Sequence, residues 1–368
     1  MFGIDARYYS HIYFWLITLL SLIVFSQYLA YSQSRLQNDK QQHSIGVFLL
    51  TLFLVLFIGF RPVSGRYFVD MVGYDTSYSI IQGDAFSISW KTNNLLFDNY
   101  FRFLASNNVP IVFFFFSMAA IYFGCMAWAC SSLFPKDKMA AFLVYLGAFS
   151  TFSYGTNGIK AGTAASLFLM ALALYSKRKW LGTIFFLLLS LGFHHAMELP
   201  VVAFIVCLFV KNPKWYFAFW VFCLLMALLH VTFFQELFSG FTDDHGAEYL
   251  LGEGQYIRKD VLGGFRIDFV LYSAVPVYIG WLAIYKKHIV SKNYLFLFNL
   301  YMFTNSIWLL CMYAAFTNRI SYLSWIMLPI VLIYPFLKEK WGAGQYKAFL
   351  WVAFGHLAFT MFMMYIYY

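Results

Sequence analysis

Residues 180–210 read WLGTIFFLLLSLGFHHAMELPVVAFIVCLFV, an apolar run interrupted near its centre by two histidines, a glutamate and a proline. One continuous helix of this length would extend about 46 Å, at 1.5 Å per residue. The hydrocarbon core of a bilayer is only about 30 Å thick, so the run is too long for one crossing and too short for two full ones. The pattern therefore predicts two short helices that meet below the outer surface. His194 and His195 would then lie in a cavity within a helical bundle, where polar backbone is tolerated.

The rest of the chain is similarly apolar. Of its 368 residues, 62% are hydrophobic, 23% are aromatic and only 11% are charged, whereas about a quarter of the residues of a soluble domain are charged. This composition excludes a soluble enzyme, a nucleic-acid-binding protein, a secreted disulfide scaffold and a disordered chain. The five cysteines all lie in apolar runs, are odd in number and lack metal-binding spacing, which favours a packing role.

A transmembrane helix needs about 20 predominantly apolar residues, and this rule predicts an all-α, polytopic transmembrane bundle of about 12 spans. We expect residues 1–368 to form one membrane domain, with two long outer segments at 61–108 and 235–266. The predicted spans are 11–31, 45–60, 109–131, 139–155, 159–176, 180–194, 196–210, 214–234, 267–285, 294–316, 319–337 and 346–367.

The distribution of lysine and arginine predicts the orientation, because these residues are retained on the cytoplasmic side of a membrane. Alternate loops divide the charge: one set carries 15 cations and three acids, and the other carries 10 cations and 13 acids. The first set is expected in the cytoplasm, which leaves both termini outside. The net charge of +9 is then a topology signal and requires no nucleic-acid partner.

The unusual polar residues all fall in loops predicted to face outward, whereas the predicted cytoplasmic loops hold ordinary lysines and little else. This one-sidedness predicts a site open to the outside. No metal site is expected, because Pro200 argues against a continuous helix through His194 and Glu198. The sequence has no Gly-rich phosphate loop, so ATP-driven transport has no support. The outward-facing set is Arg61, Arg66, Asp70, Asp75, Asn157, Lys160, His194, His195, Glu198, Arg266, Asp268, Asn318 and Arg319.

Four sequence blocks follow one another along residues 60–335. They are Phe60-Arg61 followed by Val72-Gly73-Tyr74-Asp75 and Tyr78, then Asn157-Gly158-Ile159-Lys160, then Phe193-His194, and finally Asn318-Arg319-Ile320-Ser321-Tyr322. In this order the blocks resemble the motifs of the EpsG family of Wzy-like polysaccharide polymerases. Lys160 stands where the family usually has arginine, and it keeps the charge without the planar bidentate fork. Ala196 replaces a small hydroxyl residue of the family pattern, and His195 is an additional histidine.

The resemblance implies a GT-C-like bacterial glycosyltransferase of the cytoplasmic (inner) membrane that needs no cofactor. Such enzymes transfer a growing glycan from undecaprenyl pyrophosphate onto the next lipid-linked repeat unit, on the outer face of the membrane. The products of this class are O-antigen, capsule or exopolysaccharide. Its partners are the undecaprenyl-pyrophosphate-linked oligosaccharide, the lipid bilayer and, as a further candidate, a chain-length regulator.

The reaction assigns expected roles, because a sugar hydroxyl must lose a proton and a pyrophosphate must be neutralised as it leaves. His194 is the first choice for the base, followed by His195 and Asp75. Aromatic residues of the first outer segment would stack on sugar rings or form an interfacial belt; these are Tyr74, Tyr78 and Trp90. The expected pyrophosphate contacts are Arg319, Lys160 and Arg61, with Arg266 as a further candidate. Asn157 is expected to bind substrate, and Arg66 either binds substrate or only extends its side chain to the membrane interface.

Three other functions stay open at this point. An oligosaccharide flippase would need a polar path to both faces, and mid-helix charge is scarce. A membrane O-acyltransferase would use a histidine and an arginine near the first helices, for which His11 and Arg61 are available, but the order of the four blocks would be unexplained. A ligase that transfers finished polymer shares its chemistry and fold class with the polymerase.

Overall fold

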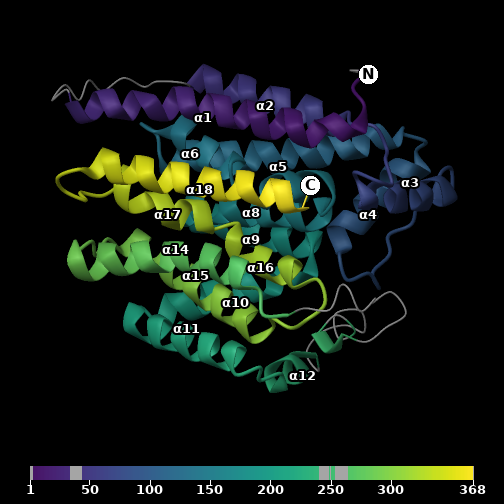
Figure 1. Cartoon of the computed structure of the whole chain (residues 1–368). Helices are drawn as coiled ribbons and strands as arrows, with labels where there is room; N and C mark the ends of the chain where they lie inside the picture. Colours follow the sequence, from purple (N-terminus) through teal and green to yellow (C-terminus); the bar gives the residue numbers. More distant parts are fainter. Residues whose placement is uncertain (1–2, 34–43, 240–247, 249, 253–263, 368) are drawn as a thin grey trace. The chain divides into compact units, whose positions relative to one another are not determined.

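The computed structural model describes residues 3–33, 44–239, 248, 250–252 and 264–367, and every regular element within these residues is a helix (Figure 1). Six helices of the described residues are long and apolar enough to cross a membrane: Ala6–Leu29, Ile111–Leu133, Ile159–Ser176, Ile267–Lys286, Thr317–Leu337 and Gln345–Ile366. Four shorter apolar helices accompany them, at Ser44–Gly59, Trp180–Phe193, His195–Phe209 and Pro213–Leu228. The predicted all-α membrane class is therefore confirmed.

The chain folds as two compact units. The first unit comprises Met1–Glu198 and Phe336–Tyr368, and the second comprises Leu199–Pro335. The chain passes between the units twice, and a proline lies within two residues of each crossing, at Pro200 and Pro335. Proline removes a backbone donor and restricts the preceding residue, so both crossings fall where a helix is locally weakened.

The first unit is built around α5 (Ile111–Leu133) and α8 (Ile159–Ser176). α5 packs on α2 (Ser44–Gly59) and α8, and α8 packs in turn on α9 (Trp180–Phe193). α1 (Tyr9–Gln33) lies against α6 (Lys138–Leu146) and against α18 (Gln345–Tyr367), which returns from the second unit. α8 is buried on most of its surface and is rich in alanine, with Gly162 in its first turn. Small residues of this kind allow membrane helices to approach closely.

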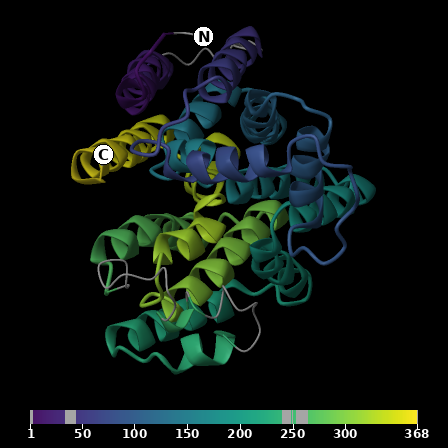
Figure 2. The same cartoon turned by 90° about the vertical axis from the view of Figure 1, so that its right-hand side faces the viewer.

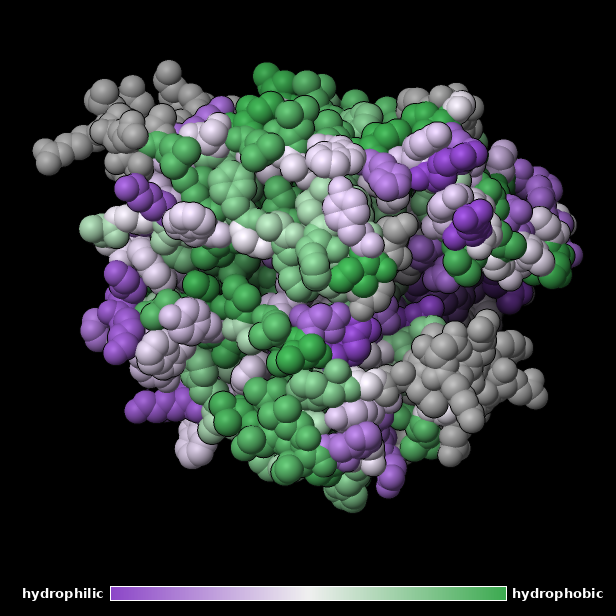
Figure 3. Space-filling view, viewed as in Figure 1, coloured by the Kyte–Doolittle hydropathy of each residue, from purple (hydrophilic) through white to green (hydrophobic). Residues whose placement is uncertain are grey.

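The first outer segment contains two helices that the sequence analysis treated only as a polar interruption. α3 (Val69–Ile81) and α4 (Leu95–Ser106) lie across one end of the first unit in Figures 1 and 2. α4 buries Phe97, Phe101 and Ala105, which recur every four residues and form one apolar stripe. On the face shown in Figure 3, hydrophilic residues gather at this end, whereas the adjoining surface of the first unit is mainly hydrophobic.

The predicted span 139–155 is interrupted after α6, and the short α7 (Thr151–Thr156) follows. The carbonyl groups that the break leaves without intrahelical partners accept hydrogen bonds from side-chain hydroxyls. Tyr13 donates to the carbonyl of Leu146 at 2.8 Å, and Thr360 donates to that of Gly147 at 2.7 Å. Because an unsatisfied backbone group in lipid costs several kcal/mol, these hydroxyls are what allows the helix to break here.

The described helices of the second unit are α10 (Glu198–Phe209), α11 (Pro213–Leu228), α12 (Phe233–Ser239), α14 (Ile267–Trp281), η4 (Leu282–Lys286), α15 (Lys292–Leu310), α16 (Thr317–Trp325) and α17 (Leu328–Leu337). The first residue of α10 and the last two residues of α17 belong to the first unit. α15 packs on α11, α14 and α16. Asn305, in the C-terminal half of α15, accepts from the Trp220 indole at 2.8 Å and donates to the Ser324 hydroxyl at 3.0 Å. Polar contacts of this kind hold apolar helices together in a membrane. They are needed because lipid tails are as apolar as the helix surfaces, so the hydrophobic effect does not drive the helices to associate.

The break predicted within residues 180–210 is confirmed. α9 ends at Phe193, His194 has an extended backbone (φ −156°, ψ 120°), and the 3-10 turn η2 (His195–Met197) leads into α10. The two short helices therefore meet at the histidines. That this junction lies below the outer surface of a bilayer stays a prediction.

A glycine substitution tests the close packing of α8. A Cβ atom at Gly162 would lie 2.3 Å from the backbone carbonyl oxygen of Tyr154, whereas a Cβ at Gly355 in α18 would meet nothing within 4 Å. Gly162→Ala should therefore destabilise the protein by about 1–3 kcal/mol through overpacking. Gly355→Ala should be neutral or slightly stabilising, because alanine favours helix. Tryptophan fluorescence during thermal unfolding in detergent measures both; equal unfolding temperatures would contradict the packing.

Candidate functional site

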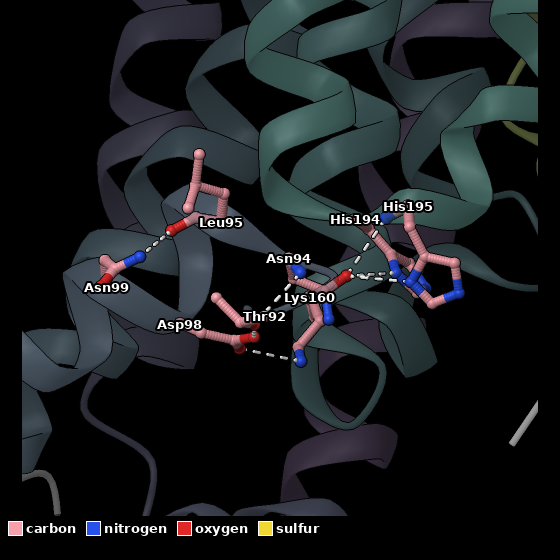
Figure 4. A network of polar contacts seen from close by, with 8 residues as sticks. All are labelled: Thr92, Asn94, Leu95, Asp98, Asn99, Lys160, His194 and His195. Atoms are coloured by element: carbon pink, nitrogen blue, oxygen red, sulfur yellow. Dashed lines mark hydrogen bonds and ion pairs between the residues drawn. The ribbon is translucent and has the colours of Figure 1, made fainter. Parts of the chain in front are cut away.

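The polar residues of the first unit converge where α9 ends (Figure 4). The segment that leads into α4 crosses the α9 break on one side, and the start of α8 lies beside η2. Gly192 makes the approach of α4 possible, because a Cβ atom there would lie 2.5 Å from the Leu96 side chain. Three separate stretches of chain therefore contribute to one place: residues 92–98, the first turn of α8, and the histidine pair.

The side-chain oxygen of Asn94 is the centre of this group. It accepts a hydrogen bond from the backbone N–H of His195 at 3.1 Å, and it lies 3.1 Å from Nδ1 of His194 and 3.2 Å from Nδ1 of His195. Asn94 is buried, and the two imidazoles are half-buried. Their rings are 5.1 Å apart and nearly perpendicular. One amide oxygen therefore lies within hydrogen-bond distance of both imidazoles and satisfies a backbone donor at the helix break.

A charged pair lies beside the amide. The Lys160 ammonium is 3.2 Å from a carboxylate oxygen of Asp98 and 4.8 Å from the centre of the Phe97 ring. Thr92 donates its hydroxyl to the other carboxylate oxygen. The side chains of Lys160 and Asp98 are 26% and 29% exposed. The pair is neutral overall but remains reachable from outside, so an anionic ligand could compete with Asp98 for the ammonium.

We name these residues the His–Lys site: Thr92, Asn94, Asp98, Lys160, His194 and His195. The site combines imidazoles that can accept a proton with a cation that can neutralise a developing negative charge. Within the described ranges, His, Cys, Asp and Glu side chains form no group of three or more that could hold a metal ion.

Arg61, predicted as a pyrophosphate contact, is only 3% exposed and hydrogen-bonds to the ends of α2 and α7. Its two terminal nitrogens donate to the carbonyl oxygens of Ile58 and Thr156, at 2.7 and 2.6 Å. The guanidinium also lies over the rings of Phe68 and Phe115, at 5.5 and 5.2 Å. Burial lowers the pKa of Arg61 to about 9, so it stays charged at neutral pH.

Because Arg61 bonds to Thr156, it fixes the turn that carries Asn157 and leads to Lys160. Asn157 itself is half-buried, and its side-chain oxygen has no hydrogen-bond partner. Arg61 therefore holds the α7–α8 turn in place, and its contacts are all with protein.

The other predicted residues of the first unit come from α3 and from the loops on either side of it. Arg66 is exposed, with its guanidinium 5.5 Å from the Tyr67 ring, and Asp75 is half-buried. Tyr78 is buried against Phe101 and donates its hydroxyl to the carbonyl of Val109 at 2.6 Å. Tyr74 is half-buried among Phe97, Phe101 and Phe114, whereas Trp90 is 76% exposed.

The other two predicted cations belong to the second unit. Arg266 pairs with Asp268 through two contacts of 3.0 and 2.6 Å and covers the ring of Phe269 at 3.7 Å. Arg319 is exposed in the first turn of α16, after Phe316, which has a left-handed backbone (φ 51°, ψ 39°). A bulky residue in this conformation is strained, and such strain is concentrated at functional positions. That Arg319 and Lys160 act on one substrate stays a prediction.

The sequence analysis missed Asn94, Asp98 and Thr92. The signal was present: Phe97 and Phe101 mark the apolar face of an amphipathic helix, and Asn94 directly precedes it. Asparagine before a helix normally caps that helix. Here its side chain instead bonds to a segment about 100 residues later, which no local pattern predicts.

The fold and the site together define a polytopic membrane protein with two imidazoles and a lysine ammonium gathered at one end of its first unit. The model of the EpsG family matches residues 44–368, so the chain belongs to the EpsG family, a Wzy-like polymerase family. Neither a curated protein nor a solved structure matches the chain.

The hydrogen bond from the His195 backbone N–H to the Asn94 side chain predicts that replacing Asn94 lowers the stability of the protein. Asn94→Ala would leave the part-buried N–H of His195 without the Asn94 oxygen as its acceptor and should cost about 1–3 kcal/mol. Asn107→Ala is the matched control, because that exposed amide bonds only to a carbonyl of its own helix. Thermal unfolding in detergent measures the difference in stability between the two variants. Equal effects of both substitutions would argue against a stabilising hydrogen bond between Asn94 and the His195 backbone.

Proposed function

We propose that this protein is a polysaccharide polymerase of the bacterial cytoplasmic membrane. It transfers a growing glycan from undecaprenyl pyrophosphate onto the next lipid-linked repeat unit at the outer face. The single observation that carries this proposal is the His–Lys site, in which two imidazoles and an exchangeable cation meet in a chain of the EpsG family. The polymer would be an O-antigen, a capsule or an exopolysaccharide.

The proposed topology has about twelve crossings, following the span length of about 20 residues, in a GT-C-like arrangement with both termini outside. The division of lysine and arginine between alternate loops supports it. In this orientation the His–Lys site and Arg319 face the side on which lipid-linked repeat units are polymerised. Trp90 and neighbouring apolar residues would then lie at the outer interface, where tryptophan is enriched.

The proposed reaction is a displacement at the anomeric carbon. A hydroxyl of the acceptor sugar attacks, the carbon–oxygen bond to the pyrophosphate breaks, and the hydroxyl proton passes to an imidazole. His194 is the first candidate for this base, with His195 and Asp75 as the others. Lys160 exchanges Asp98 for a phosphate oxygen of the leaving group, whose negative charge grows as the bond breaks.

The other predicted residues serve the same reaction in different ways. Arg319, Arg266, Arg66 and Asn157 remain proposed contacts of the lipid-linked substrates. For Arg61 the contacts with Ile58 and Thr156 support a positioning role. For Tyr78 its burial supports packing, whereas Tyr74 and Trp90 remain candidates for sugar stacking.

A ligase that transfers finished polymer is the closest alternative, because the chemistry is the same and only the acceptor differs. A flippase or an O-acyltransferase would form no glycosidic bond. One assay separates these functions: purified protein in liposomes receives only undecaprenyl-pyrophosphate-linked repeat units. A polymerase produces a ladder of lengths, whereas a ligase, a flippase and an acyltransferase leave the units unpolymerised.

Substitutions in the same assay test the site. His194→Gln should lower the rate at least about 100-fold if His194 is the base, and Lys160→Gln should raise the KM for the donor and lower kcat. Lys160→Arg should retain most of the activity, because it keeps the charge. Lys338→Gln, on a predicted cytoplasmic loop, is the control. Wild-type ladders from both His194→Gln and Lys160→Gln would contradict the assignment, provided that the variants are folded.

A further inference from the structure

We propose that Asn94 is a positioning residue that fixes the protonation pattern of the histidine pair, so that Nε2 of the oriented imidazole is the nitrogen that accepts the substrate proton. The catalytic part of this inference rests on the proposed function. The positioning part concerns the protein alone and can be measured without substrate.

The orientation of the Asn94 amide follows from the His195 backbone. A peptide N–H can only donate, and its partner at 3.1 Å is the Asn94 side chain. The atom that faces it must therefore be the amide oxygen rather than the amide nitrogen. This contact removes the usual ambiguity between oxygen and nitrogen in an asparagine side chain.

The oxygen then decides the histidine tautomer. Nδ1 of His194 and Nδ1 of His195 both face this oxygen, at 3.1 and 3.2 Å. An oxygen without a proton can only accept, so an imidazole that bonds to it must carry its proton on Nδ1. In a neutral imidazole of this tautomer the lone pair lies on Nε2, which is the nitrogen able to act as a base.

The Asn94 oxygen can accept a full hydrogen bond from only one of the two imidazoles at a time. A carbonyl oxygen has two lone pairs, and the backbone N–H of His195 uses one of them. The two Nδ1–H groups therefore share the second, at distances that differ by only 0.1 Å. The site thus contains one oriented base and one neighbouring imidazole, whose rings lie 5.1 Å apart.

The neutrality of asparagine matters for turnover. A carboxylate in this position would hold the proton on the imidazole after it had been accepted, because an adjacent negative charge favours the imidazolium. An amide orients the ring equally well without that charge. The proton can then leave the site more readily between rounds of transfer.

Several charged side chains belong to the described elements around the pair. The elements packed around the histidines carry Asp98 and Arg102 on α4, Lys160 on α8 and Glu198 at the start of α10. Asp98 and Lys160 pair with each other, which reduces their net effect on the imidazoles. A new charge at Asn94 would lie within hydrogen-bond distance of both imidazoles, so it should change the pH response of the site.

The decisive substitution is Asn94→Asp, which keeps the shape and the acceptor oxygen but adds one negative charge. Its pH–rate profile in the liposome assay should move upward by about one pH unit or more, because an opposite charge within hydrogen-bond distance favours the protonated imidazole. Asn94→Leu should lower kcat by at least about 100-fold, with a smaller change in KM. Asn93→Asp places the same charge on the neighbouring exposed residue and should shift the profile by much less. An unmoved profile for Asn94→Asp, or equal shifts for both aspartates, would overturn the proposal.

A second measurement does not depend on activity. Protein labelled with ¹⁵N-histidine in nanodiscs reports the tautomer of each imidazole by solid-state NMR, and His194→Gln and His195→Gln assign the two signals. We expect a neutral Nδ1–H tautomer in the wild-type pair and its loss in Asn94→Leu. Finding only Nε2–H tautomers at both histidines would overturn the role of Asn94. A chain that makes no polymer but shows the Nδ1–H signal would overturn the proposed function alone.

Discussion

The first unit depends on one constraint: a backbone N–H group within an apolar run must find an acceptor when the helix breaks. At the break after α9, the acceptor of the His195 N–H is the amide oxygen of Asn94, which comes from a distant outer segment. At the predicted depth within a bilayer such a donor would have little water to bond to, so the break would depend on Asn94. The requirement for backbone satisfaction therefore also fixes the position of the two imidazoles.

Close helix packing makes this arrangement possible. Gly192 admits Leu96 of α4 against the end of α9, and Gly162 admits the carbonyl of Tyr154 against the first turn of α8. Both glycines lie within two residues of a polar residue of the site, His194 and Lys160. Larger residues would push apart the helices that present the imidazole and the ammonium. The small residues of these helices thus control geometry at the site as well as packing.

The sequence predicted the features that depend on local length and charge, and it failed where distant residues meet. The break at His194 followed from the length of one apolar run, and the helical class followed from composition. The bond from Asn94 to His195 joins residues about 100 positions apart, and the pair of Asp98 with Lys160 joins residues about 60 apart. No periodicity encodes such pairings. The resemblance to the EpsG family was confirmed, whereas the residue roles it implied remain proposals.

The predicted cationic side chains differ in the contacts that each of them already makes within the protein. The terminal nitrogens of Arg61 are bonded to backbone carbonyls in a buried position, so releasing them for a substrate would expose two helix ends. Arg266 has a bidentate carboxylate partner. Lys160 has a single ion-pair contact and about a quarter of its side chain exposed, and Arg319 is exposed in a strained turn. A pyrophosphate binds most favourably to a cation whose present contacts cost little free energy to break. This criterion supports the proposal that Lys160 and Arg319 are substrate contacts, and the contacts of Arg61 support its role in holding the α7–α8 turn that leads to Lys160.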